Sequence, residues 1–241
     1  MNKILKKFIQ NILRIVGWKL IKIRKPAEPN PYGKLDENIL KTINNCSGIL
    51  HLGAHRGTEA EVYNWFGKNV IWIEALPKTF EYLVDNLFFY KNQIALQALL
   101  TDKDNQNIKF NISNYDAACS SIFQFTEIIK SSEIWSKKDH KMLNTINLKS
   151  SKLDTLLQKN NIKPENYNHW ILDLQGAELL ALKGGEKSLE FCNSIYIEVS
   201  KVNVYSGAVL WDELKNWLIK KNFYPLSEPT NDEEDILFVK K

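Results

Sequence analysis

Residues 48–74 read GILHLGAHRGTEAEVYNWFGKNVIWIE, two apolar runs separated by a turn and an amphipathic segment. The first run predicts a buried strand, and Gly53 and Gly57 allow the tight turn that follows it. Apolar residues then recur with helical spacing, and the second run predicts another buried strand, which ends at Glu74. The stretch therefore predicts a strand–helix–strand unit, the building block of a parallel sheet.

The turn of this unit indicates a nucleotide cofactor. A dinucleotide-binding turn has the pattern G-x-G-x-x-G, whereas this one reads G-A-H-R-G and lacks the third glycine. Glu74, at the carboxyl end of the second strand, is placed to accept hydrogen bonds from two ribose hydroxyls. A ribose carboxylate without a pyrophosphate cradle favours S-adenosylmethionine over NAD. The alternative is an ordinary strand–helix–strand unit with a surface Glu.

Length and composition fit one sizeable α/β domain of a chain with 241 residues and 44% hydrophobic content. The three cysteines, Cys46, Cys119 and Cys192, are widely spaced and form neither a disulfide framework nor a metal-ligand pattern. We therefore expect a reducing, cytoplasmic compartment and a reaction without a metal.

The basic charge is concentrated at the N-terminus. Residues 1–25 carry eight basic side chains and no acid, which leaves 24 basic and 28 acidic side chains, a net charge of −4, in the remainder. This distribution argues against a nucleic-acid-binding body. Residues 3–23 predict a basic amphipathic helix that is too often interrupted by charge to span a bilayer. It either lies on an anionic membrane surface, at the inner face of the membrane, or packs on the domain or on a second subunit.

A proline-rich linker follows this helix, so we expect residues 1–30 to be an N-terminal extension and residues 31–241 to be the catalytic domain. Further along the chain, polar side chains recur where strands end. Asp102 follows a predicted third strand, Asp173 lies near the end of a later one, and Glu198 ends the next. Residues 125–144 predict a weakly packed helix, and the last two predicted strands form a hairpin.

Four motifs together resemble the FkbM family of S-adenosylmethionine-dependent methyltransferases: LHLGAHRGTEAEVY, WIEALP, LDLQGAELLALKGGEKSL and IYIEVS. The resemblance covers about residues 35–241. It implies an α/β fold of the class I, Rossmann-like type, with a mostly parallel seven-stranded sheet, helices on both faces and a closing antiparallel hairpin. It also implies O-methylation of a hydroxyl, often on a sugar.

The resemblance also assigns roles to individual residues. Gly53, Ala54 and Gly57 match the cofactor turn, Glu74 the ribose carboxylate and Asp102 the adenine-side residue. The full set of expected cofactor-binding residues is His51, Gly53, Ala54, Gly57, Glu59, Glu74, Ala75, Asp102, Ser121 and Asp173. The sequence departs from the family pattern at His51, where an acid is usual, and at Ile171, where many members have Lys.

Asp173 is the first candidate for the general base, because methyl transfer to an alcohol needs a group that removes the proton. His55 and Glu198 are weaker candidates. Expected acceptor-binding residues are Gln175, Glu178 and Ser120, and the acceptor is a small molecule or a glycan precursor. Two rival functions stay open: a non-catalytic, membrane-docked partner of glycan-building enzymes, and a nicotinamide oxidoreductase. The sequence leaves the oligomeric state open.

Overall fold

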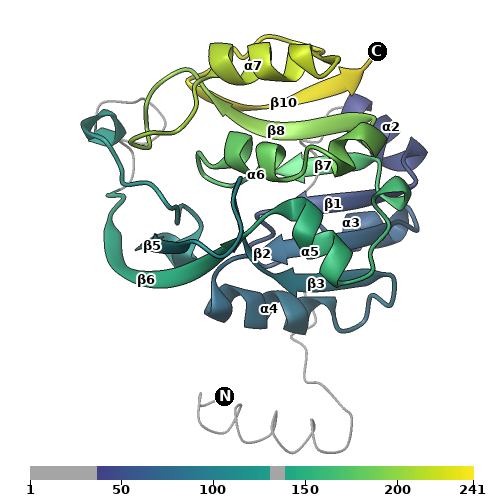
Figure 1. Ribbon diagram of the computed structural model, residues 1–241, viewed down its shortest axis with the longest axis horizontal. Helices are drawn as coiled ribbons and strands as arrows, with labels where there is room; N and C mark the ends of the chain where they lie inside the picture. The colour runs from purple at the N-terminus through teal and green to yellow at the C-terminus, as the bar shows by residue number, and fades with distance from the viewer. Residues whose placement is uncertain (1–36, 131–138) are drawn as a thin grey trace, which may run out of the picture. The chain divides into compact units, whose positions relative to one another are not determined.

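The computed structural model describes residues 37–130 and 139–241, which form one α/β unit around a central sheet. The sheet has seven strands in the order β3-β2-β1-β7-β8-β10-β9 (Figure 1). The strands are β1 (Gly48–Leu52), β2 (Asn69–Glu74), β3 (Gln93–Gln97), β7 (His169–Leu172), β8 (Ser194–Ser200), β9 (Phe223–Pro225) and β10 (Glu233–Lys240). Only β10 runs antiparallel to its neighbours β8 and β9, which confirms the predicted parallel sheet with a closing hairpin.

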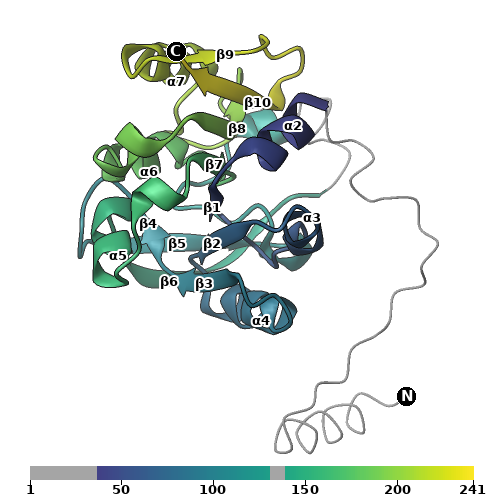
Figure 2. The ribbon, with the colours of Figure 1, turned by 90° about the vertical axis from the view of Figure 1, so that its right-hand side faces the viewer.

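Helices cover both faces of this sheet, as predicted (Figure 2). On one face lie α2 (Glu37–Asn45), α3 (Ala60–Trp65) and α4 (Pro77–Leu87). On the other lie α5 (Leu153–Lys159), α6 (Glu178–Gly184) and α7 (Trp211–Lys220). Every residue of β1 and of β7 is buried, because a parallel sheet between two helix layers has no solvated face. This is why the two strands appear in the sequence as continuous apolar runs.

A second sheet of three strands lies where β1 and β2 end (Figure 1). It consists of β4 (Leu99–Leu100), β5 (Asn107–Ser113) and β6 (Met142–Ser151), in the order β4-β6-β5. The prediction of a helix over residues 125–144 is wrong at its last residues, since β6 begins at Met142 and pairs antiparallel with β5. Residues 127–130 form only a short 3-10 turn, η2 (Glu127–Lys130). Cross-strand pairing overrides the weak helical pattern here.

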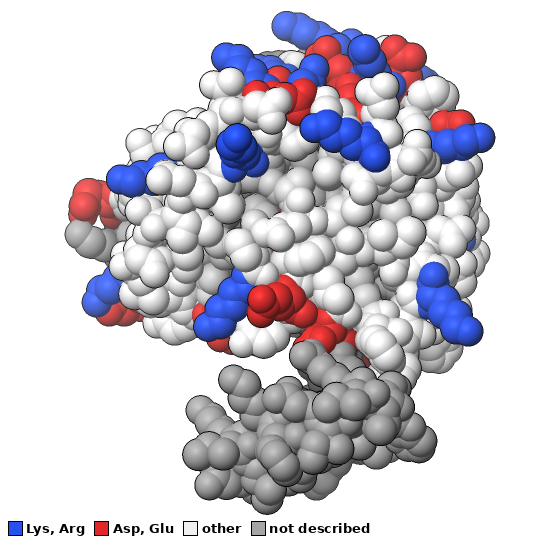
Figure 3. Space-filling view, turned by 60° about the horizontal axis from the view of Figure 1, so that its bottom comes forward, with Lys and Arg blue, Asp and Glu red and all other residues white. Residues whose placement is uncertain are grey.

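In the view from the side of α4 and the edge strand β3, charged side chains gather mostly along the upper margin, and the middle of the face is largely uncharged (Figure 3). Its exposed apolar residues are Tyr82, Val84, Phe88, Phe89 and Ile94.

The N-terminal segment predicted at residues 1–30 lies outside the described residues. Within the described ranges, none of the helices has both the length and the apolar character needed to cross a membrane.

Candidate active site

A cavity of about 210 Å³ opens at the carboxyl edge of the main sheet, between that sheet and the small one. Predicted site residues that line it are His51, Gly53, Ala54, His55, Glu59, Glu74, Ala75, Ser120, Asp173 and Gln175. The small sheet and the loop after β5 supply an apolar wall that sequence reasoning missed, formed by Leu99, Leu100, Phe110, Ala117 and Ile122. Phe110 lies in the alternating run Ile108, Phe110, Ile112, which indicates a strand but does not indicate a cavity wall. The carboxyl edge of a parallel sheet is where α/β proteins bind ligands.

The floor of the cavity is the turn after β1. Gly53 has a φ of 86°, and a Cβ at this position would overlap the backbone carbonyl of Asp173. The amides of Gly53 and Ala54 both donate to the Ile73 carbonyl, at 2.9 and 3.0 Å. The turn is therefore drawn tightly between β2 and β7, and only glycine fits at its first position.

Glu74 is fixed at the end of β2 by two backbone donors. Its Oε2 accepts the His55 amide at 2.9 Å, and its Oε1 accepts the Leu76 amide at 2.8 Å. The side chain is 8% exposed, and burial raises its pKa to about 7, although the backbone hydrogen bonds oppose this shift. Each carboxylate oxygen keeps a lone pair for a further donor, so the group can accept two ligand hydroxyls.

Asp173 follows β7 and faces the cavity, where solvent reaches it. The Gln175 amide nitrogen donates to Asp173 Oδ1 at 2.5 Å and to Glu198 Oε2 at 3.0 Å. Desolvation by the surrounding protein raises the pKa of Asp173, while the Gln175 hydrogen bond lowers it. Burial and the neighbouring carboxylates of Asp173 and Glu178 raise the pKa of Glu198. Of the three candidate bases, Asp173 and His55 line the cavity and Glu198 does not.

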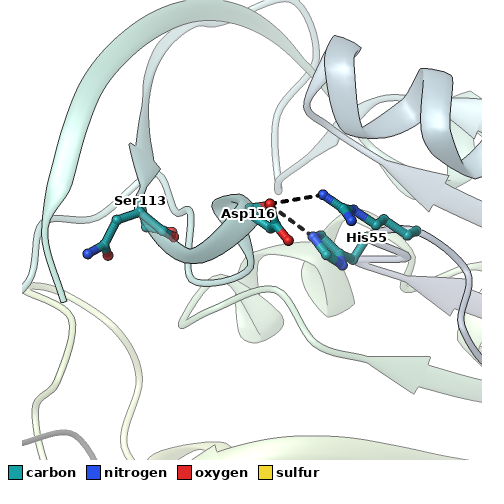
Figure 4. Close-up of polar contacts among 5 residues, drawn as sticks. His55, Ser113 and Asp116 are labelled. Carbon is teal, nitrogen blue, oxygen red and sulfur yellow. Dashed lines mark hydrogen bonds and ion pairs between the residues drawn. The ribbon is translucent and has the colours of Figure 1, made fainter. Parts of the chain in front are cut away.

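His55 contacts a loop that closes over the turn (Figure 4). Its Nε2 lies 3.0 Å from the carbonyl oxygen of Asp116, and because a carbonyl only accepts, Nε2 carries the proton. Arg56 pairs with the Asp116 carboxylate, Nη2 to Oδ1, at 3.1 Å. This contact makes His55 part of a closure between two loops.

The closing loop, η1 (Tyr115–Ala117), has an unusual backbone. Its three residues have φ values of 53°, 61° and 64°, in the left-handed region that favours glycine. Ser120 holds the base of the loop, since its Oγ donates to the Ala117 carbonyl at 2.7 Å and accepts the Ser113 amide at 3.0 Å. Ser120, a predicted acceptor-binding residue, thus lines the cavity, and its two hydrogen bonds hold the closing loop in place.

Four other predicted residues do not line the cavity. A Cβ at Gly57 would lie 2.6 Å from Leu83, so this glycine lets α4 pack against the turn. Ser121 Oγ donates to the Gln175 carbonyl at 2.7 Å. Glu178 Oε1 accepts the amides of Leu174 and Gly176 at 2.7 and 3.2 Å, and burial raises its pKa to about 7. Asp102 lies in the loop after β4, away from the lining.

His51 contributes a neutral wall where the family pattern has an acid. Its ring stacks on Trp72 with centroids 4.5 Å apart, and its Nδ1 lies 3.2 Å from the Tyr63 hydroxyl. Burial lowers the pKa of His51, so the ring stays uncharged near neutral pH. The group beside the cofactor turn is therefore an aromatic ring and not a carboxylate.

Together, the sheet order, the glycine turn and the buried carboxylate at the end of β2 are those of a class I methyltransferase fold. The chain belongs to the FkbM methyltransferase family, since the model of the methyltransferase FkbM domain matches residues 51–225. Its cofactor is S-adenosylmethionine. No curated protein matches the chain.

Several solved structures are similar to the chain at low identity. Magnesium protoporphyrin IX methyltransferase from Synechocystis, with bound SAM, is 10% identical with a TM-score of 0.44, over 84% of this chain and 74% of that one. A TehB-like SAM-dependent methyltransferase from Corynebacterium glutamicum is 8% identical with a TM-score of 0.43, over 100% of both chains. A putative caffeoyl-CoA O-methyltransferase from Staphylococcus aureus is 12% identical with a TM-score of 0.43, over 99% of this chain and 93% of that one.

The residues of the cavity fit S-adenosylmethionine. Gly53 leaves the space that a Cβ would fill, and the Glu74 carboxylate is oriented by two amides and open to ribose hydroxyls. The turn lacks the third glycine and hence the usual pyrophosphate cradle, as suits a cofactor without phosphates.

Proposed function

We propose that this enzyme methylates a hydroxyl group of a sugar or glycan precursor, and that Asp173 accepts the hydroxyl proton. The observation that carries the proposal is the Asp173 carboxylate at the cavity, with one oxygen held by Gln175. Within residues 37–130 and 139–241, Oδ2 of Asp173 has no hydrogen-bond partner, so it is available to an acceptor hydroxyl. A carboxylate whose pKa is raised is a stronger base near neutral pH than an ordinary Asp.

The roles of the other residues follow from their contacts. When bound, S-adenosylmethionine supplies an electrophilic sulfonium methyl group. Glu74 binds the ribose hydroxyls, and Gly53 and Ala54 let the backbone approach the cofactor. Leu100 and Phe110 give the apolar wall, which excludes water from the ligand. The proton of the acceptor passes to Asp173, and positioning of the hydroxyl supplies most of the remaining rate.

The test of the proposal is methyl transfer by the wild type and by Asp173→Asn, with a panel of sugars and nucleotide sugars as acceptors. Formation of S-adenosylhomocysteine and of methylated sugar is followed by mass spectrometry. We expect turnover to fall by about 100-fold or more in Asp173→Asn. Cofactor affinity should change by less than about twofold, because Asp173 acts on the acceptor. Equal turnover of both proteins across the pH range would refute the base role.

Calorimetry separates this proposal from its rivals. Binding of S-adenosylmethionine with turnover of a hydroxylated acceptor supports the methyltransferase. Binding without turnover of any acceptor in the panel would favour the non-catalytic partner, and binding of NAD in its place would favour an oxidoreductase. Glu74→Ala provides the site control: it should weaken cofactor binding roughly 10-fold, the value of one charge-assisted hydrogen bond.

We further propose that residues 3–23 hold the enzyme at an anionic membrane surface, where lipid-linked glycan acceptors occur. The support is the run of basic residues beside an apolar helical face in the sequence. Attraction of about 1 kcal/mol per basic residue is enough for reversible binding that salt weakens.

Flotation with anionic and neutral vesicles tests the membrane proposal on the full chain and on a chain shortened to begin at Pro31. Changing Lys3, Lys6 and Lys7 to Gln should weaken binding to anionic vesicles about 100-fold. If the shortened chain floats as well as the full one, or if neutral vesicles bind equally, the segment is better explained as a packing or dimerisation helix.

A further inference from the structure

We propose that Tyr205 is a positioning residue for the reaction: its hydroxyl orients the Gln175 amide so that this amide holds Asp173 and Glu198 apart and keeps Asp173 facing the cavity. The proposal rests on the base role of Asp173 proposed above, which it deepens. Tyr205 lies in the segment between β8 and α7, is 2% exposed and does not line the cavity.

Gln175 is the link between Tyr205 and the carboxylates. The Tyr205 hydroxyl donates to Gln175 Oε1 at 2.5 Å, while Gln175 Nε2 donates to Asp173 and to Glu198. Both N–H groups of the amide are therefore used by the two carboxylates. An amide can donate to both carboxyl groups only if its nitrogen faces them. The carbonyl oxygen must then face away, and Tyr205 provides the donor that satisfies it.

The backbone of Gln175 is fixed independently. Its φ is 53°, and its carbonyl accepts the Ser121 hydroxyl at 2.7 Å. With the main chain anchored in this way, the remaining freedom of the residue is the rotation of its side chain. Tyr205 restricts that rotation from the side opposite to the carboxylates. Hydrogen bonds therefore hold each group of the relay from Tyr205 through Gln175 to Asp173 in place.

Tyr205 is held rigidly enough to serve this role. Its ring lies against Phe125, with centroids 5.2 Å apart, and packs in a small core with Ile129 and Val204. Its hydroxyl also lies 3.2 Å from the Cys119 carbonyl, a longer contact than the one to Gln175. Burial raises the pKa of Tyr205, so the hydroxyl keeps its proton near neutral pH and remains a donor.

The charges around Asp173 make its pKa depend on how Gln175 is oriented. Titratable side chains interact with Asp173 from the cofactor turn, from the end of β2, from α6, from β8 and from β10: His55, Glu59, Glu74, Glu178, Glu198 and Asp235. Except for His55, these groups are acidic and disfavour a second negative charge nearby. The Gln175 hydrogen bond is the contact that lowers the pKa of Asp173 most. Loss of its orientation should therefore raise the pKa of Asp173 and leave less of the ionised base.

The experiment compares Tyr205→Phe with Tyr167→Phe in the full chain. Tyr167 is a partly buried tyrosine that precedes β7, at the opposite end of that strand from Asp173, so its substitution controls for the loss of a hydroxyl. The carboxyl carbon of Asp173 is followed by NMR in the cofactor-free protein between about pH 4 and 9. We expect its pKa to rise by about one pH unit in Tyr205→Phe and to stay unchanged in Tyr167→Phe.

Two further measurements connect this shift to the reaction. Turnover of Tyr205→Phe at neutral pH should fall about 10-fold, and the acid limb of its pH–rate profile should move with the Asp173 pKa. Affinity for S-adenosylmethionine should change less than about twofold, because Tyr205 does not line the cavity.

Gln175→Met removes the link itself, so the double variant with Tyr205→Phe should be no more impaired than Gln175→Met alone.

The outcomes are distinct. An unchanged Asp173 pKa in Tyr205→Phe, or additive effects of the two substitutions, would overturn the relay. If Tyr205→Phe does not fold, Gln175→Met must still raise the Asp173 pKa, and a pKa equal to that of the wild type would overturn the relay as well. If the pKa shift appears while Asp173→Asn retains full turnover, the base assignment fails and the relay stands as a feature of the site.

Discussion

Glu74, the proposed ribose-binding residue, should make the stability of the domain depend on pH, and Glu74→Gln makes this dependence measurable. The carboxyl has an ordinary pKa of 4.5 in the unfolded chain, and burial raises it to about 7 in the folded protein. Between these values the folded state binds more protons than the unfolded state. Stability from this group is therefore fully present below pH 4.5 and is lost as the pH rises through 7.

The size of the effect follows from the two pKa values. Each pKa unit corresponds to about 1.4 kcal/mol, so the ionisation of Glu74 should lower the free energy of unfolding by about 3 kcal/mol above neutral pH. Gln cannot ionise and lacks this dependence. It does present an amide nitrogen to one of the two backbone donors, from His55 or Leu76, and this mismatch should cost about 1–3 kcal/mol at every pH.

Urea denaturation of the cofactor-free proteins at about pH 4.5 and about pH 8 gives the test. Between these conditions the wild type should lose about 3 kcal/mol more than Glu74→Gln. Glu178, whose pKa is also raised to about 7, contributes equally to both proteins and cancels from the difference. Parallel pH dependences would refute the reasoning, because they would mean that Glu74 is ionised in the folded protein at low pH or is well solvated.

Three further substitutions test the turns around the cavity. Gly53→Ala should lower the free energy of unfolding by about 3 kcal/mol or more in urea denaturation, since its Cβ meets the Asp173 carbonyl at a φ of 86°; a normal unfolding curve would contradict the tight turn. Ala117→Gly should raise the midpoint of thermal unfolding, with a gain of about 1 kcal/mol from relief of its φ of 64°; a loss would show that the loop is not strained. Ser121→Ala should cost about 1–2 kcal/mol, measured by urea denaturation, because it leaves the Gln175 carbonyl without its donor, and a neutral result would mean that water replaces the hydroxyl.

The parts of the fold that the sequence predicts well are those where one local pattern decides the structure. Residues 49–52 and 70–73 are continuous apolar runs because their strands lie between two helix layers. Gly53 marks the turn because no other residue fits there. Glu74 lies where a strand-end acid is expected, and its hydrogen bonds to the turn follow from that position. These features need no knowledge of distant parts of the chain.

The features that sequence reasoning missed depend on partners far apart in the chain. β6 has the weak pattern MLNTINLKSS and becomes a strand only through pairing with β5. Tyr205 looks like an ordinary aromatic residue until the fold brings it to Gln175, thirty positions earlier. Asp116 lies in a loop with left-handed φ angles, and the loop contains no glycine that would indicate them in the sequence. Such contacts are set by tertiary structure, which a local pattern does not encode.

The two-residue strand β4 has a consequence for the order in which the molecule assembles. Leu99 and Leu100 belong to the cavity wall, and their strand partners are Ser150 and Ser151 of β6, much later in the chain. A contact that closes so long a loop forms late in folding, because the entropy of closure must be overcome before the pairing stabilises it. Asp173 follows β7, which comes later still. We therefore expect the cofactor to bind a finished cavity, so that its binding energy resists unfolding of the completed domain.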